Sequence, residues 1–273
     1  MGGAPANFTY HSRSLGADAR VLSQVGRDAP GHDLLAALGA LSIPTDGVAV
    51  DSGHPTGTVT VEMDAQGQHA FTIHEAVAWD FLASSSKWEH LVAEADAVCF
   101  GSLAQRSPQS RDTIAALLSH ASTRCLRVFD VNLRQHYFSQ EVIEHALQLA
   151  NVLKLNDAEL PVIAPMLGLK GDVRGQIQLL AQRFDLLLVA YTRGANGSLL
   201  LHQGRFVEQA AIPVTVRDTV GAGDSFTAVV TVGLLAGWPV SRIIAVAAEV
   251  AAYVCSKPGA TPPMPPHFTE QFR

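Results

Sequence analysis

The sequence has few charged residues and few cysteines. Asp, Glu, Lys and Arg together make up 16% of its 273 residues, and the net charge is -6. No cluster of Lys or Arg is present, which argues against a nucleic acid or an anionic membrane surface as a partner. The three cysteines, Cys99, Cys125 and Cys255, are far apart in apolar surroundings. They predict reduced thiols in the core of a cytoplasmic protein and no disulfide framework.

The sequence also lacks the signatures of several other protein classes. It has no signal-peptide pattern and no apolar run long enough to cross a bilayer. Its eleven histidines are scattered, and none has the spacing of zinc ligands. The absence of G-x-G-x-x-G after a first strand argues against a nicotinamide-dependent oxidoreductase, and the absence of G-x-x-x-x-G-K-[ST] excludes a P-loop ATPase. A hydrophobic content of 48% suffices for a large core in one or two domains, and the partner we expect is a compact polar substrate.

What is present is an alternation of strands and helices. Apolar runs predict the strands, and apolar residues at helical spacing predict the helices between them. The predicted strands cover residues 19–25, 96–101, 126–131, 152–155 and 186–191, and the predicted helices cover 8–15, 30–41, 109–120, 140–149, 175–184 and 240–255. Such alternation builds a parallel sheet with helices on both faces, and ligands bind at the carboxyl ends of its strands. We therefore expect an α/β fold.

One region interrupts this alternation. Residues 58–63 and 69–74 alternate between apolar and polar side chains on either side of a turn at 64–67. This pattern predicts a β-hairpin with one apolar face. Inside a chain of strands and helices, it indicates a flap inserted at about residues 48–76.

Polar side chains follow one predicted strand after another. They are Ser102, Asp130, Asn132, Arg134, Asn156 and Glu159. Each can be read as a turn former or a helix cap, and the spacing of Asn156 and Glu159 is typical of a capping arrangement. Caps do not explain why all of these residues fall at one edge of the predicted sheet, so we also expect a binding site there.

Two glycine-rich segments leave their roles open. Gly2 and Gly3 precede a predicted helix in which Asn7 offers both a donor and acceptors, a pattern that fits a ligand contact or a plain turn. Residues 192–197 follow a buried strand, and they form either a hairpin turn or a backbone edge that borders a nucleotide.

Residues 217–226 carry the strongest chemical signal. Gly221 and Gly223 precede Asp224 and a long apolar run, which predicts a loop that enters a buried helix. The free amides and the dipole of a helix start bind anions, and glycines let the backbone approach a phosphate closely. Asp224 is then either a cap of this helix or a general base that takes a proton from a hydroxyl attacking the phosphate.

These motifs resemble those of the ribokinase-like (PfkB) family of carbohydrate kinases, over essentially the full length of the chain. The segment from Gly2 to Thr9 is similar to the amino-terminal pattern of that family, and the segment from Asp218 to Asp224 is similar to its carboxy-terminal pattern. The resemblance implies a three-layer αβα sandwich with a mostly parallel central sheet and a small β lid. It implies one kinase domain over residues 1–273, with the lid hairpin at about 48–76.

The resemblance also implies roles for individual residues. Asp224 would be the base that deprotonates a sugar hydroxyl, and the amides of Gly221, Ala222 and Gly223 would bind the γ-phosphoryl group of ATP. The residues implied to contact the sugar are Gly3, Asn7 and Arg134. Those implied to lie near the nucleotide are Asn156, Glu159, Thr192, Gly194, Asp218, Thr219 and Gly259. Glu159 would help to organise Mg²⁺ indirectly, and a monovalent cation is a further candidate cofactor.

Within the family, the segments at 2–7, 55–59 and 76–80 look most like bacterial fructokinases. Ribose, 2-keto-3-deoxygluconate and nucleosides are the alternative substrates, and the lid implies a homodimer. Family members have a first core strand and an acid that contacts the sugar before the paired glycines, whereas this sequence starts at Met1-Gly2-Gly3. A second hypothesis is therefore an amino-terminally truncated, poorly active form that binds nucleotide or a partner.

Overall fold

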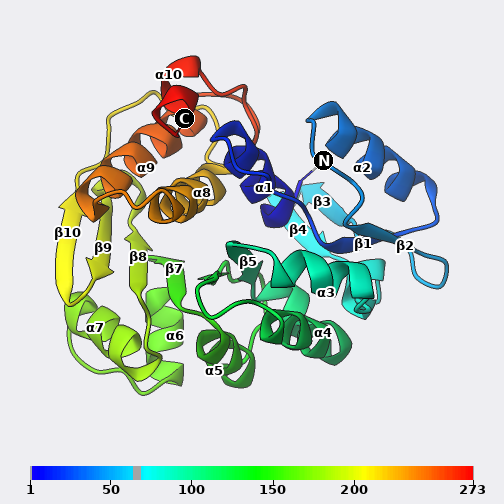
Figure 1. Cartoon of the computed structure of the whole chain (residues 1–273), viewed down its shortest axis with the longest axis horizontal. Coiled ribbons are helices and arrows are strands. Elements are labelled where there is room, and N and C mark those ends of the chain that lie inside the picture. Colours follow the sequence, from blue (N-terminus) through cyan, green and yellow to red (C-terminus); the bar gives the residue numbers. More distant parts are fainter. Residues whose placement is uncertain (1, 64–68, 273) are drawn as a thin grey trace.

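The computed structural model describes residues 2–63 and 69–272, and its largest sheet has six strands in the order β10-β9-β8-β7-β6-β5 (Figure 1). The strands are β5 (Ala97–Gly101), β6 (Leu126–Asp130), β7 (Val152–Asn156), β8 (Leu188–Thr192), β9 (Ser198–His202) and β10 (Arg205–Gln209). Strands β5 to β8 are parallel, and β9 and β10 are antiparallel to their neighbours. The expected mostly parallel α/β sheet is confirmed.

Helices cover both faces of this sheet (Figure 1). The helices on one face are α5 (Gln140–Leu149), α6 (Leu160–Met166) and α7 (Val173–Arg183), and those on the other are α1 (Ala4–Ser14), α8 (Ala222–Leu235) and α9 (Val240–Cys255). Alternate residues of β7 serve the two cores, because Leu153 and Leu155 face α5 to α7 whereas Val152 faces α8 and α9. The expected three layers are therefore present.

Helix α8 lies deep in the second core. Its residues from Ser225 to Thr231 are all buried, and it packs against α1 and α9 as well as the sheet. A helix that is apolar nearly all round needs neighbours on several sides. The element that begins at Gly221 is therefore held firmly from its first turns onward.

The rest of the chain forms two smaller sheets and several helices. Strands β1 (Ser23–Gly26) and β2 (Val48–Asp51) pair in parallel, and β3 (Val59–Met63) and β4 (His69–Ile73) form an antiparallel hairpin. The helices in this part are α2 (Ala29–Ala40), α3 (Ser86–Ala93) and α4 (Pro108–Ser119). Strand β2 thus belongs with β1 and not with the hairpin, although both fall within the predicted flap.

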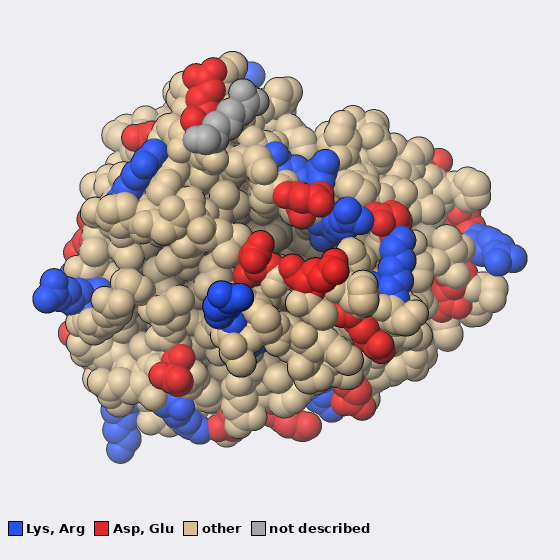
Figure 2. Space-filling view, in the orientation of Figure 1, with Lys and Arg blue, Asp and Glu red and all other residues tan. Residues whose placement is uncertain are grey.

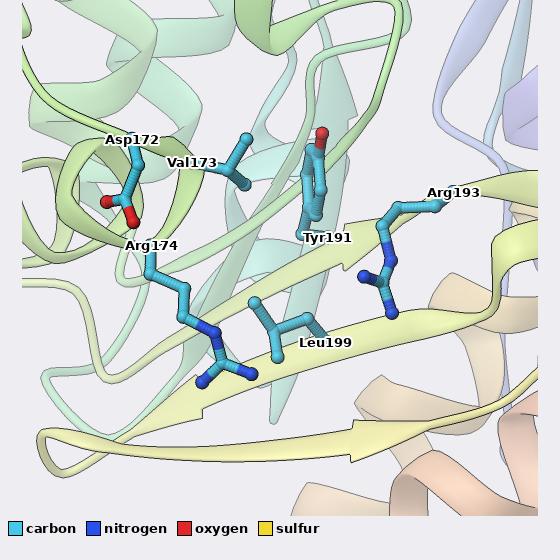
Figure 3. Close-up of a pocket in the computed structure, with 6 residues that line it drawn as sticks. All are labelled: Asp172, Val173, Arg174, Tyr191, Arg193 and Leu199. Carbon is cyan, nitrogen blue, oxygen red and sulfur yellow. The ribbon is translucent and has the colours of Figure 1, made fainter.

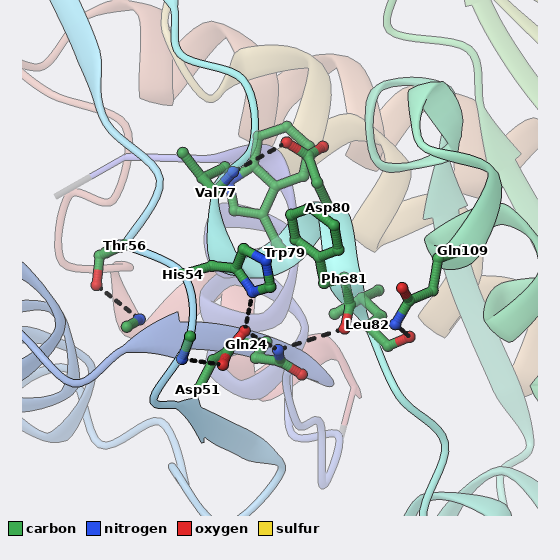
Figure 4. Close-up of polar contacts among 12 residues, drawn as sticks. Gln24, Asp51, His54, Thr56, Val77, Trp79, Asp80, Phe81, Leu82 and Gln109 are labelled. Atoms are coloured by element: carbon green, nitrogen blue, oxygen red, sulfur yellow. Dashed lines mark hydrogen bonds and ion pairs between the residues drawn. The ribbon is translucent and has the colours of Figure 1, made fainter.

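Polar contacts tie the β1–β2 sheet to the short helix η1 (Ala78–Phe81) (Figure 4). The buried Gln24 side chain donates to Asp51 Oδ2 at 2.9 Å and to the Phe81 carbonyl at 3.3 Å. The His54 ring lies 2.7 Å from the same Asp51 oxygen and stacks on Phe81. Because a buried amide needs its partners, Gln24 fixes the position of η1 relative to β1.

Several element bounds differ from the prediction. Helix α1 begins at Ala4 and not at residue 8, because Pro5 fits the first turn of a helix and needs no donor there. Strand β1 is shorter than predicted, and α3, α6 and β10 were not predicted at all. The predicted turn at 64–67 lies outside the described residues. Within the described part of the chain, no helix combines the length and apolar character needed to span a membrane.

Candidate active site

The parallel strands bring their polar ends to one edge of the sheet, as predicted. Ser102, Asp130, Asn156 and Thr192 stand at or directly after the ends of β5, β6, β7 and β8. The Ser102 hydroxyl donates to the Val131 carbonyl at 2.7 Å and so serves the backbone of the neighbouring strand end. Of the other three, Asp130 contacts α8 directly, because its carboxylate accepts from the Thr227 hydroxyl at 2.8 Å.

Residues 218–224, called here the glycine turn, form the start of α8. Gly221 is the residue before the helix, has φ of +82°, and offers no side chain to cap it. A Cβ atom at Gly221 would lie 2.4 Å from the Ala260 carbonyl oxygen, so only glycine fits. The amides of Gly223 and Asp224 have no acceptor among the described residues. Two free amides at a helix start form an anion site.

The carboxylate of Asp224 faces α1 and does not cap its own helix. Its Oδ2 accepts a hydrogen bond from Asn7 Nδ2 at 2.8 Å, across a sequence separation of 217 residues. Burial raises the pKa of Asp224 to about 6, and the Asn7 hydrogen bond opposes this shift. A carboxylate with a pKa near neutrality is suited to accept a proton from a substrate hydroxyl.

Helix α1 brings a second buried side chain to the glycine turn. Gly3, with φ of +126°, precedes the helix. The backbone N–H of Asn7 donates to the Gly3 carbonyl at 3.1 Å. One turn after Asn7, His11 is fully buried and lies 2.9 Å from the Ala260 carbonyl, the same atom that crowds Gly221. Burial lowers the pKa of His11 to about 4, so the ring is neutral. Sequence reasoning missed His11, although its i+4 spacing from Asn7 placed both on one helix face.

A buried ion pair lies beneath the glycine turn. Lys154 Nζ is 3.0 Å from Asp130 Oδ1, and both side chains are less than one-tenth exposed. Asp130 was predicted as a polar strand end, whereas Lys154 was not predicted. Its signal was a single lysine inside the apolar strand 152–155.

Asn156 and Glu159 form the reciprocal capping arrangement that their spacing indicated. Asn156 Oδ1 accepts from the Glu159 amide at 2.9 Å, and Glu159 Oε2 accepts from the Asn156 amide at 2.8 Å. Glu159 Oε1 also accepts from the Leu133 amide at 3.1 Å, so this carboxylate joins the ends of β6 and β7. Burial raises the pKa of Glu159, against the opposing effect of Lys154.

Both carboxylate oxygens of Glu159 therefore already accept hydrogen bonds from backbone amides. This arrangement suits an indirect role toward a metal ion better than direct ligation. Nowhere in residues 2–63 and 69–272 do three His, Cys, Asp or Glu side chains gather as ligands for a metal. Arg134 is exposed, donates to the Leu133 carbonyl at 3.0 Å, and lowers the pKa of Asp224 through its charge.

The carboxy-terminal loop is fastened to the glycine turn. Asp218 accepts hydrogen bonds from the amides of Val220 and Gly259, both at 3.0 Å. The Thr219 carbonyl accepts from the Ala222 amide at 3.3 Å. Asp218, Thr219 and Gly259, which the resemblance assigned to the nucleotide, are thus brought together with Gly221 in one structural unit.

Thr192 and Gly194 lie at the end of β8, where their carbonyls accept from the amides of Asp157 and Gly197. Next to them is a pocket of about 320 Å³ whose lining includes Tyr191 and two arginines, Arg174 and Arg193 (Figure 3). Both arginines form ion pairs with Glu208, at 2.8 and 2.7 Å. The positive charges of the two arginines are therefore partly neutralised by Glu208 of β10. The residues that line this pocket include none of the glycine turn.

The charged side chains on the face seen in Figure 2 are of both signs, and several of each surround a hollow near the middle of that view. No single-sign field covers this face, in keeping with the balanced charge of the sequence.

The sequence matches proteins of known class over most of its length. The model of the pfkB family carbohydrate kinases matches residues 1–267. A fructokinase of Salmonella typhimurium is 32% identical over 242 residues, which cover 86% of this chain and 76% of that protein. A fructokinase of Escherichia coli is 30% identical over 254 residues, with the same coverage of 86% and 76%.

Solved structures agree with these matches. The crystal structure of a sugar kinase from Pyrococcus horikoshii in complex with ATP has a TM-score of 0.79 and 27% identity, covering 95% of this chain and 84% of that one. A fructokinase with bound ATP from Xylella fastidiosa shares the fold, with a TM-score of 0.85 and 24% identity over 99% of this chain and 89% of that one. This chain belongs to the pfkB family of carbohydrate kinases and is a sugar kinase.

Proposed function

We propose that this chain is a fructokinase that transfers the γ-phosphoryl group of ATP to a hydroxyl of fructose, with Asp224 as general base. The observation that carries this proposal is the contact between Asn7 and Asp224 at 2.8 Å. It joins the helix that follows the paired glycines to a buried carboxylate at the start of α8, beside two free amides. A hydroxyl held near Asn7 would thus lie between a base and an anion site.

The residues present fit ATP as phosphoryl donor. The free amides of Gly223 and Asp224 lie at a helix start, where negative charge is favoured, and the glycine turn that carries them packs closely against the Ala260 carbonyl at Gly221. ATP with Mg²⁺, when bound, supplies the phosphoryl group and neutralises part of its charge. Thr192, Gly194, Asp218, Thr219 and Gly259 would border the nucleotide.

In this reaction Asp224 takes the proton of the attacking hydroxyl. The hydroxyl oxygen forms its bond to the γ-phosphorus as the bond from that phosphorus to the bridging oxygen of ADP breaks. The free amides of Gly223 and Asp224 hold the negative charge of the transferring group, whereas the Ala222 amide, expected to share this role, already donates to the Thr219 carbonyl. Asn7, Gly3 and Arg134 would orient the sugar, and Glu159 would fix the strand ends near Mg²⁺ through its two backbone contacts.

We also propose that the β3–β4 hairpin is a lid of a single kinase domain and that it pairs with a second copy of the chain. Its stem is held to the body by Arg106, which donates to the His74 carbonyl at 2.5 Å, and by Tyr137, which donates to the Ile73 carbonyl at 2.9 Å. Val59 on this hairpin is 52% exposed, although it is apolar. An exposed apolar strand favours burial against another surface.

The test is Asp224→Asn, assayed with Mg²⁺, ATP and a panel of fructose, ribose, 2-keto-3-deoxygluconate and a nucleoside. We expect the wild-type protein to prefer fructose, and the variant to lose about three or more orders of magnitude in kcat while retaining its affinity for ATP, since only the base is removed. A variant with near-normal kcat would exclude Asp224 as the base. Preference for another member of the panel would replace fructose and leave the mechanism standing.

A further inference from the structure

The ion pair between Lys154 and Asp130 is buried where ion pairs are rare. Both side chains are less than one-tenth exposed, and Lys154 stands in a strand whose other members are almost all apolar. Lysine is seldom buried, and an apolar pair of similar size is often at least as stable. The pair therefore needs an explanation other than the stability of the strands it joins.

This pair touches the first turn of α8 at two points. Asp130 Oδ2 accepts from the Thr227 hydroxyl at 2.8 Å, and the same hydroxyl lies 3.0 Å from the Gly223 carbonyl. Lys154 Nζ lies 3.2 Å from the place that a Cβ of Gly223 would occupy. The absence of a side chain at 223 thus lets the ammonium group approach the backbone that carries the anion site.

We propose that Lys154 is a positioning residue for phosphoryl transfer: it holds the glycine turn in place together with Asp130 and Thr227, and its positive charge keeps the buried Asp224 in its ionised form. This inference rests on the proposed role of Asp224 as general base. The proposed role explains why a charged residue, Lys154, is buried in the otherwise apolar strand β7, which the conformation of the glycine turn by itself does not.

The charges around Asp224 come from several elements. Asp130 of β6 raises its pKa, whereas Lys154 of β7 and Arg134 of the loop after β6 lower it, and burial is the largest contribution. Asn7 of α1 donates a hydrogen bond to it.

Two further titratable groups border this cluster, Cys99 of β5 and Glu159 before α6. Burial lowers the pKa of Lys154, but the surrounding acids, Asp130 foremost, more than offset this, so the ammonium stays charged. Lys154 and Asp130 therefore act on Asp224 in opposite directions.

This opposition provides the test. We would measure kcat for fructose phosphorylation between pH 5 and 9 for Lys154→Met, Asp130→Asn and Lys154→Arg. In Lys154→Met the acid limb of the profile should move upward by about one pH unit, because an opposing charge is lost, and kcat at pH 6 should fall about fivefold beyond any uniform loss. In Asp130→Asn, which keeps an acceptor for Thr227, the limb should move to lower pH. Lys154→Arg retains the positive charge, so the acid limb of its pH profile should lie at the wild-type position.

A purely structural role would lower kcat equally at every pH and leave all three limbs in place, which would overturn the inference. A shift of Lys154→Met and Asp130→Asn in the same direction would overturn it as well. If Lys154→Met does not fold, Lys154→Gln, which removes the charge but keeps a hydrogen-bond donor for Asp130, takes its place and should show the same upward shift. Failure of the proposed function is separate, because it would show as full activity of Asp224→Asn.

Discussion

Two regions of this molecule are built differently. The glycine turn belongs to α8, which is buried between the six-stranded sheet, α1 and α9. The region from β1 to the hairpin, residues 23–76, consists of two separate two-stranded sheets with exposed apolar residues such as Val50 and Val59. Two-stranded sheets are marginally stable by themselves. The first region is fixed by a large core, whereas the second has only a small apolar cluster around Leu38 and Ile43 and depends more on its hydrogen bonds.

An acid in each region shows the difference. Asp224 is buried with one hydrogen bond, and burial raises its pKa to about 6. Asp28 accepts from the Thr56 hydroxyl and amide and from the Gly31 amide, and these bonds lower its pKa. The charged form of Asp28 therefore stabilises the fold, whereas burial makes the charged form of Asp224 unfavourable. A residue that is unfavourable for stability where it stands indicates function.

The largest effect should come from the glycine turn itself. In Gly221→Ala the new Cβ would lie 2.4 Å from the Ala260 carbonyl oxygen, at a φ of +82°. The turn must shift, which moves the amides proposed to hold the phosphoryl charge. We expect kcat to fall by about 10²- to 10³-fold, as when an oxyanion-hole donor is lost. Steady-state kinetics with saturating ATP and fructose measure this.

The matched control is Gly16→Ala. Gly16 also has a positive φ, +95°, but no atom lies within 4 Å of its added Cβ. The substitution should cost about 1 to 2 kcal/mol of backbone strain and leave kcat unchanged. Equal losses of kcat in the two variants would mean that strain, and not the position of the amides, explains the effect.

The second effect concerns pH and stability. The folded-state pKa of Asp224, about 6, lies above the ordinary value of 3.8 for an aspartate, so the folded state binds more protons between these values. Stability contributed by this group is present at low pH and lost as the pH rises through 6. Asp224→Asn should therefore match the wild type near pH 4 and exceed its free energy of unfolding by about 2 to 3 kcal/mol above pH 7, at 1.36 kcal/mol per pKa unit. Urea unfolding at several pH values measures the difference.

The opposite sign is expected for Asp28→Asn. Because the pKa of Asp28 is lowered in the folded state, its contribution is present at neutral pH and lost as the pH falls through the folded value. This variant should be less stable than the wild type at pH 7, and the deficit should shrink in acid. The same sign of change in both variants would remove the contrast between the two acids.

Much of the fold followed from apolar periodicity. Helices α5 and α9 begin and end at the predicted residues, because a Ser cap or a proline precedes each and the apolar spacing is regular. Helix α6 was missed since its seven residues include Pro161 and Pro165, which argue against a helix. Strand β10 was missed because its exposed edge position leaves no clear apolar pattern.

The site was predictable to a lesser extent. The glycine motifs identified Asp224 and Asn7, but their hydrogen bond is a product of the whole fold and spans 217 residues. Lys154 and His11 belong to no recognisable sequence motif. Their importance follows from contacts with residues distant in sequence, Gly223 for Lys154 and Ala260 for His11. The capping alternative for Asp224 was excluded only by the direction in which its side chain points. Sequence patterns give local conformation, whereas these contacts are set by packing.

The smallest effect should come from the β1 to hairpin region. Thr56 is buried at the stem of the hairpin, where its hydroxyl accepts from the Gly26 amide at 2.8 Å and donates to Asp28 at 2.5 Å. Thr56→Val removes both bonds and keeps the shape of the side chain. We expect the KM for fructose to rise by up to about thirtyfold, the equivalent of two hydrogen bonds at about 1 kcal/mol each, with kcat and the KM for ATP nearly unchanged.

Thr60→Val is the control within the hairpin, because the Thr60 hydroxyl contacts only the His74 ring at the surface, at 2.7 Å. It should leave all three constants at their wild-type values. If Thr56→Val raised the KM for ATP as much as the KM for fructose, the hairpin stem would influence both substrates, and the two regions would not differ in the substrate that they affect. A change confined to the KM for fructose would tie the β1 to hairpin region to the sugar and not to ATP.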